Sequence, residues 1–395
     1  MRKNRSTSRS LTWKHHVVIF VFVLVGGVAL SYFTVPSLTS LTYTSPTAQA
    51  TVVVPGVPVV PTVTHLETPE PLKAVYMSSW VAGTPSIRTK MVKLVDETEL
   101  NAIVIDIKDY TGKVSFEVKD LKLKAIGSSE RRIADIEDFI RELHKKNIYV
   151  IGRVAVFQDP YMVKLHPEWA VKKESDGSIW KDYKGITWID AGARENWDYI
   201  GLIAKEAYSV GFDEINLDYI RFPSDGNMKD IAYPFSQNGV HADVIKDFFA
   251  YITPIIKSHG LTVSGDLFGM TTTNKDDLNI GQILEDALLY FDYVAPMVYP
   301  SHYPKGFNGH SDPNKYPYEV VNYSMSEAVK RALAASTSPL KLRPWLQDFD
   351  YGGNYGTEEV RAQIKATYDA GLTSWFLWNA SNVYTREALD AVSPE

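Results

Sequence analysis

Eight short apolar segments, separated by helical patterns and loops, occupy the chain from Leu72 to its C-terminus. Short apolar runs that alternate with amphipathic stretches are typical of parallel strands joined by helices. Eight such units predict a closed (β/α)8 barrel, also called a TIM barrel. A doubly wound open sheet is the alternative, but no glycine-rich phosphate loop follows an early strand. The predicted strands are 73–79, 101–107, 148–156, 214–219, 261–267, 293–299, 342–349 and 374–379.

The fourth strand has the sequence EINLDY and shows which of its side chains face the barrel interior. Alternate side chains of a strand share a face, so Glu214, Asn216 and Asp218 lie on one side. Ile215 and Leu217 lie on the other side, where the surrounding helices would cover them. Asp218 therefore stands at the carboxyl end of a barrel strand, which is where such barrels carry out their chemistry.

Polar and aromatic side chains follow most of the other predicted strands at the same end. If the barrel closes, they meet in one bowl, where aromatic faces can pack on sugar rings and polar groups can bind hydroxyls. This pattern indicates a carbohydrate site. The candidate residues are Asp106, Lys108, Arg153, Asn216, Asp218, Arg221, Asp266, Tyr299, Gln347 and Trp378.

Glycoside hydrolysis needs two carboxyl groups in different protonation states. We expect Asp218 to be the nucleophile or stabilising carboxylate, kept ionised by Arg221 three residues later. Asp266, beside Phe268, is the expected acid/base, because partial burial would raise its pKa. Asp106 is the reserve candidate for either role. Each of these aspartates has a structural alternative as a helix cap or loop anchor.

Composition and the remaining motifs exclude several other classes of function. A net charge of −6, without a basic stretch beyond the N-terminus, argues against nucleic-acid binding. The absence of cysteine excludes thiolate metal sites and cysteine nucleophiles. His302, His310 and Asp312 match no compact ligand motif, so we expect neither a metal nor another cofactor. The long aromatic-rich insertion 157–196 is predicted to form a lid or cleft wall.

The N-terminus predicts export and attachment to a membrane. Basic residues precede an apolar run from Val17 to Val35, long enough to span a bilayer, and predict that the remainder is extracytoplasmic. We expect an uncleaved signal-anchor; cleavage after Ala50, which would release a secreted protein, is the alternative. The predicted organisation is a basic tail and anchor over 1–35, a Thr/Pro/Val-rich, poorly ordered linker over 36–71, and the barrel over 72–395.

Four sequence blocks resemble a family of bacterial glycoside hydrolase-like proteins that is classed as a domain of unknown function. They are INLDYIRFP at 215–223, VIDIKDYTG at 104–112, GRVAVFQD at 152–159 and VAPMVYPSHY at 294–303. The resemblance implies a TIM barrel distantly similar to the α-amylase-like glycosidases, which place a carboxylate nucleophile where Asp218 stands. Those enzymes have a glutamate acid on the fifth strand, whereas this chain has Asp266.

The leading hypothesis is therefore a glycosidase that cleaves O-glycosidic bonds of an envelope or extracellular polysaccharide. The expected partners are a poly- or oligosaccharide and the membrane, which the N-terminal helix would enter. A non-catalytic carbohydrate-binding barrel is the first alternative, with the same cleft but no working acid. A metal-dependent deacetylase or hydrolase is the second.

Overall fold

The computed structural model describes residues 63–237 and 239–391, and eight parallel strands within them form a closed barrel. The strands follow one another around the barrel in chain order, and β8 pairs with β1. This confirms the predicted (β/α)8 architecture. The strands are β1 Lys73–Met77, β2 Ala102–Lys108, β3 Tyr149–Ala155, β4 Glu214–Asp218, β5 Thr262–Phe268, β6 Tyr293–Met297, β7 Trp345–Gln347 and β8 Trp375–Trp378.

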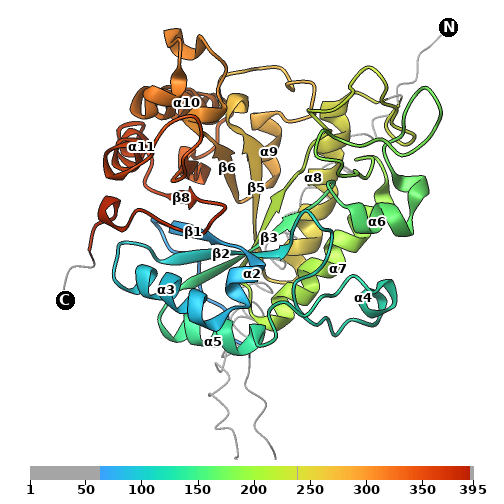
Figure 1. Ribbon diagram of the computed structural model, residues 1–395, viewed down its shortest axis with the longest axis horizontal. Coiled ribbons are helices and arrows are strands. Elements are labelled where there is room, and N and C mark those ends of the chain that lie inside the picture. The colour runs from blue at the N-terminus through green and yellow to red at the C-terminus, as the bar shows by residue number, and fades with distance from the viewer. Residues whose placement is uncertain (1–62, 238, 392–395) are drawn as a thin grey trace, which may run out of the picture. The chain divides into compact units, whose positions relative to one another are not determined.

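Helices lie outside the strands, as Figure 1 shows. The longer ones separate successive strands and agree with the helical patterns of the sequence to within a few residues. They are α3 Pro85–Asp96, α5 Ile136–Lys145, α7 Arg194–Val210, α8 His241–Ser258, α9 Leu284–Tyr290, α10 Pro317–Ala334 and α11 Thr357–Asp369. The shorter helices α2 Ser79–Ala82, α4 Leu121–Ile126 and α6 Pro160–Leu165 all follow strands.

The helix α5 shows why these segments pack as they do. Ile136, Phe139, Ile140 and Leu143 recur at helical spacing and are all buried, so one face of the helix is apolar. Burying each such side chain contributes about 1.5–3 kcal/mol. Asp and Glu in the first turn and His and Lys in the last turn complement the helix dipole. The face opposite the apolar stripe is left for solvent.

The barrel interior contains its own buried cluster, separate from the apolar layer between strands and helices. Alternate residues of the strands fill it, including Val104, Ile151, Ala295, Trp345 and Phe376. The outward-facing residues of the same strands join the larger cluster under the helices. The barrel is thus packed with side chains and leaves space only near one end.

Polar groups are also buried inside the barrel, at the start of β4. Glu214 accepts a hydrogen bond from Arg343 Nη1 at 3.1 Å, and both side chains are completely buried. Tyr149 donates to the same carboxylate oxygen at 3.3 Å. Burial raises the pKa of Glu214, while the guanidinium of Arg343 acts in the opposite direction. This network lies two residues before Asn216 and four before Asp218 along the inward face of β4.

The insertion between β3 and α7 folds onto the carboxyl-end side of the barrel. It contains α6 and is held by isolated bridges, among them Gln158 with Trp188 and Lys172 with Ala232. Trp180 and Trp188 are buried within it. These two rings therefore pack inside the insertion, whereas Tyr183 is exposed.

The predicted anchor 17–35 and most of the predicted linker lie outside the described residues. Within the ranges that the structure describes, no helix is both long and apolar enough to cross a bilayer.

Candidate active site

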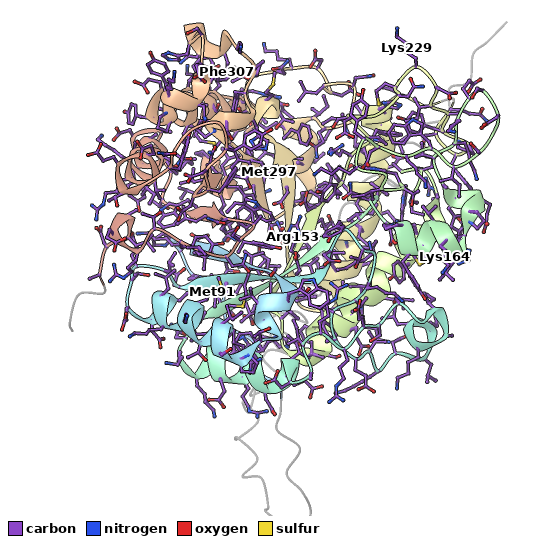
Figure 2. The ribbon with its side chains drawn as sticks, in the orientation of Figure 1. Met91, Arg153, Lys164, Lys229, Met297 and Phe307 are labelled. Atoms are coloured by element: carbon purple, nitrogen blue, oxygen red, sulfur yellow. The ribbon has the colours of Figure 1, made fainter. Side chains whose placement is uncertain are left out.

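A cavity of about 480 Å³ opens at the carboxyl ends of the strands. Two carboxyl groups and two arginines line it, from β3, β4, β5 and the loop after β4. Aromatic residues from β8 and from the loop after β6 line it as well. In Figure 2, Arg153 lies near the middle of the barrel and Met297 beside it, whereas Lys164, Lys229 and Phe307 lie toward the periphery. Of the predicted residues, those that line the cavity are Arg153, Asp218, Arg221, Asp266, Tyr299 and Trp378.

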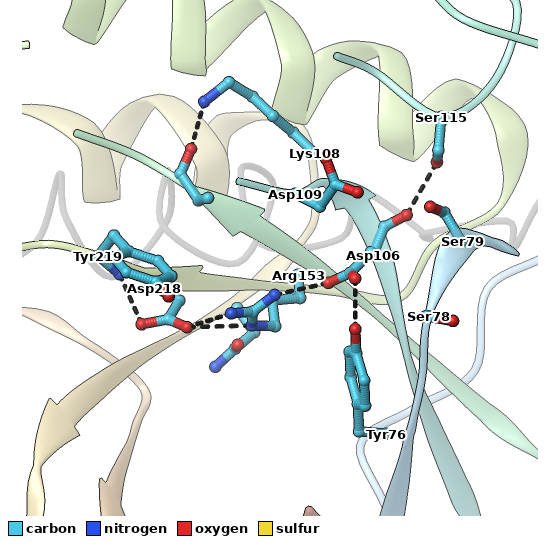
Figure 3. Close-up of polar contacts among 12 residues, drawn as sticks. Tyr76, Ser78, Ser79, Asp106, Lys108, Asp109, Ser115, Arg153, Asp218 and Tyr219 are labelled. Carbon is cyan, nitrogen blue, oxygen red and sulfur yellow. Dashed lines mark hydrogen bonds and ion pairs between the residues drawn. The ribbon is translucent and has the colours of Figure 1, made fainter. Parts of the chain in front are cut away.

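Asp218 is held by an arginine from the neighbouring strand. Arg153 Nε donates to Asp218 Oδ2 at 3.1 Å, and Nη2 donates to the same oxygen. The other carboxylate oxygen accepts the backbone N–H of Tyr219 at 2.5 Å. These contacts, drawn in Figure 3, hold the carboxylate between a guanidinium and a backbone N–H.

Arg153 also binds a second carboxylate, because Asp106 lies on the strand at its other side. Nη1 donates to Asp106 Oδ1 at 2.6 Å, and Tyr76 donates to Oδ2 at 2.6 Å. Burial lowers the pKa of Arg153, but the two carboxylates outweigh it and hold the pKa well above the usual value. Asp106 is thereby occupied by Arg153 and Tyr76, and it does not line the cavity. Its position is that of a support for Arg153.

Arg221 and Asp218 do not form the predicted ion pair, although the Asp218 carboxylate acts to raise the pKa of Arg221 against the burial that lowers it. Among the described residues no carboxylate lies within 4.0 Å of the Arg221 guanidinium, and Nη1 donates to the carbonyl of Phe222 at 2.9 Å. The chain turns between the two residues, since Tyr219 has a φ of +54°. Three residues of separation therefore did not bring the side chains into contact, and Arg153, from a neighbouring strand, takes the predicted place.

Asp266 lies at matching height on β5. The last paired residues of β4 and β5 are Leu217 and Gly265, and Asp218 and Asp266 follow them by one residue each. Burial, and then the nearby Asp218 carboxylate, raise the pKa of Asp266 well above its usual range. Asn216 Nδ2 and Trp345 Nε1 both donate to Oδ1 at 2.8 Å. Oδ2 has no hydrogen-bond partner among the described residues, so it is free to carry a proton.

Three other predicted ligands do not line the cavity. Lys108 is fully buried in an ion pair with Asp159 Oδ2 at 2.9 Å, and in Figure 3 its side chain extends away from Asp106 and Arg153. A register irregularity between Asp106 and Lys108 turns the end of β2 in this way. Asn216 is buried beneath Asp266, and Gln347 accepts the backbone N–H of Ser301 at 3.2 Å. These side chains contact other protein groups and do not face the cavity.

Several cavity residues were not predicted from the sequence. Phe268, Met270 and Met297 add apolar surface, Tyr219 and Tyr303 add aromatic rings, and Lys184 reaches the cavity from the insertion. The alternation of β6 could have indicated Met297, because Tyr299 two residues later had been placed on the inward face. Tyr219 gave no such signal, since its placement depends on a left-handed backbone conformation.

His302 and His310, both in the loop between β6 and α10, have different surroundings. His302 lines the cavity, and burial lowers its pKa. His310 stacks on Tyr316, with ring centroids 4.0 Å apart, and Asp312 pairs with Lys315 at 3.3 Å. In the described part of the chain no group of three His, Cys, Asp or Glu side chains is arranged to hold a metal ion.

The closed barrel and the cavity at the carboxyl ends of its strands place the protein in the class of (β/α)8 barrels. Residues 74–384 match the model of a family described as "Putative glycosyl hydrolase domain". The chain belongs to this family, and it is accordingly a glycosidase. No curated protein sequence matches the chain.

Solved structures extend the comparison. A hypothetical protein from Ruminiclostridium thermocellum is 35% identical, and the match covers 49% of this chain and 96% of that one at a TM-score of 0.44. The glycoside hydrolase domain of PgaB (BpsB) from Bordetella bronchiseptica is 14% identical over 81% of this chain and 99% of that one, at 0.59. An alpha-L-fucosidase from Paenibacillus thiaminolyticus is 13% identical over 81% and 47%, at 0.52. The last two share the barrel fold.

Proposed function

We propose that this glycosidase cleaves O-glycosidic bonds of an envelope or extracellular polysaccharide with Asp218 and Asp266 as its two carboxyl groups. The observation that carries the proposal is that the two carboxyl groups line one cavity but have different surroundings. Asp218 accepts hydrogen bonds from a guanidinium and a backbone N–H, whereas burial raises the pKa of Asp266. Two carboxyl groups held in opposite protonation states are what glycoside hydrolysis requires.

In the proposed reaction, protonated Asp266 donates its proton to the glycosidic oxygen while the bond from that oxygen to the anomeric carbon breaks. The ionised Asp218 carboxylate stabilises or attacks the anomeric carbon, which becomes positively charged. Water supplies the hydroxyl group that ends on the anomeric carbon, and its remaining proton returns to Asp266. Arg153 and Asp106 position Asp218, and Trp378 offers a ring against which the sugar can pack.

The experiment is a hydrolysis screen of the purified full chain against polysaccharides and aryl glycosides, with Asp218→Asn and Asp266→Asn alongside. We expect each substitution to lower kcat/KM by about 10²–10⁴-fold. An aryl glycoside with a good leaving group should rescue Asp266→Asn more than Asp218→Asn, because that leaving group needs less protonation. Undiminished hydrolysis in both variants would contradict the assignment.

We further propose that the protein works outside the cytoplasmic membrane, anchored by the apolar run 17–35. The cationic residues before this run and its length support the proposal. Protease added to intact cells should digest the barrel, and the cell-associated protein should retain its N-terminal tail. Recovery of a form beginning after Ala50 in the medium would instead support cleavage and secretion.

A further inference from the structure

Arg221 is a buried cation that lines the cavity without a carboxylate partner. The residue is 8% exposed, and the one hydrogen bond of its side chain among the described residues is from Nη1 to the Phe222 carbonyl at 2.9 Å. Two other arginines of the barrel are buried, Arg153 and Arg343, and each of them contacts a carboxylate. A guanidinium that is buried beside a cavity and retains free donors is prepared to bind an anion.

Aromatic rings surround this guanidinium and restrict how a ligand can reach it. Its central carbon lies 4.8 Å from the ring centroid of Trp188, 4.6 Å from that of Phe268 and 5.6 Å from that of Tyr219. Rings beside a guanidinium stabilise its charge but accept no strong hydrogen bonds from it. The remaining donors lie in the plane of the group, where they match the two oxygens of a carboxylate.

The acidic groups near Arg221 are occupied by other donors. Asp218 binds Arg153. Asp182 accepts hydrogen bonds from Trp188 Nε1 at 3.1 Å and from the backbone N–H groups of Lys184 and Ile186 at 3.0 and 2.8 Å. Asp225, which is exposed, accepts the backbone N–H of Tyr183 at 3.4 Å. These carboxylates lower the local potential, but none of them reaches the guanidinium.

A second cation lines the same cavity from a different segment. Lys184, in the insertion, is exposed and forms no ion pair with any described residue. Arg153, Arg221 and Lys184 thus face two carboxyl groups, and burial favours the protonated form of Asp266. Arg153 is already paired with Asp106 and Asp218, so Arg221 and Lys184 are the two lining cations that form no ion pair with any described residue.

We propose that the substrate is an acidic polysaccharide and that Arg221 binds the carboxylate of a uronic acid unit in the cavity, with Lys184 at its entrance. This inference rests on the proposed glycosidase function and specifies the substrate class. A neutral glycan would leave Arg221 buried without an anion, whereas a sugar carboxylate would complete its hydrogen bonding.

The test measures binding separately from hydrolysis, using the full chain with Asp266→Asn, a substitution that we expect to prevent turnover. Calorimetric titrations use polygalacturonate, alginate, hyaluronan and heparosan, each compared with its carboxyl-reduced form. Dextran sulfate is titrated as well, to test whether sulfate groups bind instead of carboxylates. We expect at least one acidic polymer to bind roughly 10-fold or more tightly than its reduced form, the size expected for a charged hydrogen bond.

Substitutions then assign that preference to the two cations. Arg221→Gln should remove the difference in affinity between the acidic polymer and its reduced form, and Arg221→Lys should restore part of that difference. Lys184→Gln should weaken acidic binding by roughly 2–5-fold, as for a solvent-exposed charge. The matched control is Lys181→Gln, which removes an exposed lysine of the same loop that does not line the cavity and should change nothing.

The outcomes are separable. The inference is overturned if no acidic polymer is preferred, if only dextran sulfate binds, or if the preference survives Arg221→Gln in a protein with native circular dichroism. If Arg221→Gln does not fold, the test relies on Lys184→Gln. An unchanged affinity of that variant for the acidic polymer would count against the inference. Hydrolysis of neutral glycans that depends on Asp218 would leave the proposed function standing and remove only the acidic substrate.

Discussion

At the residue scale, two aspartates on adjacent strands differ because their neighbours differ. The alternation of the EINLDY strand was sufficient to predict that Glu214, Asn216 and Asp218 share the interior face. The partner of Asp218 was not predictable in the same way, because the sequence shows neighbours along the chain and Arg153 is a neighbour across the sheet. Cross-strand contacts depend on register, which only the folded barrel defines.

Asp266→Asn should make the protein more stable at high pH while it reduces activity. Because burial raises the folded-state pKa of Asp266, its protonation stabilises the protein below the unfolded pKa, and this stabilisation is lost as pH rises through the folded pKa. Asparagine keeps the Oδ1 acceptor for Asn216 and Trp345 and never ionises.

Urea denaturation at several pH values between 4 and 9 measures this effect. The variant should lose less stability toward high pH than the wild type, by about 1.4 kcal/mol for each pH unit between the unfolded and folded pKa values. A variant whose stability followed the same pH curve as the wild type would show that Asp266 is ionised in the folded protein.

Arg153→Met should strongly destabilise the protein. It removes the cation between Asp106 and Asp218 and leaves two buried carboxyl groups without it, which typically costs about 3–5 kcal/mol. Arg153→Lys should cost less, because the charge remains although the bidentate geometry is lost.

Adding Asp106→Asn to Arg153→Met should recover part of the lost stability, because it removes one of the two buried carboxylates that no longer have a cation. A double-mutant cycle from chemical denaturation measures the coupling. Additive effects of the two substitutions would mean that Arg153 and Asp106 do not interact as their 2.6 Å contact indicates.

At the element scale, the end of β2 serves two different parts of the molecule. Asp106 faces the barrel interior, whereas Lys108 is directed to Asp159, the N-cap residue of α6 in the insertion. Strict alternation placed both side chains in the bowl, and the register irregularity between them broke that period. The sequence contains no signal for this irregularity, so Lys108 was assigned to the wrong environment.

Lys108→Met should loosen the insertion. The substitution leaves the fully buried Asp159 carboxylate without its cation, and we expect a loss of about 3–5 kcal/mol. Asp159 also caps α6 by accepting the N–H of Met162 at 2.8 Å, so the damage should concentrate in this segment. Limited proteolysis should cleave residues 157–193 faster than in the wild type.

The control for this prediction is the double variant Lys108→Met, Asp159→Asn, which keeps the cap and removes the unpaired charge. It should regain part of the stability and of the protease resistance. Equal cleavage rates in the wild type and in Lys108→Met would contradict the role of this ion pair.

At the scale of the whole molecule, the count and order of the strands were predictable and the loops were not. Each strand is a short apolar run such as AIVIDIK or TVSGDLF, bounded by polar turns, so local pattern was enough to find all eight. The insertion after β3 has no periodicity, and its path depends on buried tryptophans and isolated bridges that join distant residues. That is why the insertion was predicted to line the cleft with aromatic rings, whereas Lys184 is its one described residue that lines the cavity.

Because β8 closes the barrel against β1, residues 63–391 should unfold in one cooperative transition. We expect a chain without residues 1–62 to melt within about 2 °C of the full chain's barrel transition, whereas a chain ending at Ala370, which lacks β8, should not fold. Calorimetry and circular dichroism measure both. Two separate transitions within 63–391, or a folded chain without β8, would contradict this view of the barrel.

The left-handed backbone at Tyr219 has an implication for how the enzyme can evolve. One of the donors that orient Asp218 is a peptide N–H, which every residue except proline provides. Natural or laboratory variation at position 219 can therefore reshape the cavity wall while the carboxylate keeps this contact. Asn and Gly, which accept positive φ most readily, are the replacements through which new sugar specificities could be reached at the least conformational cost.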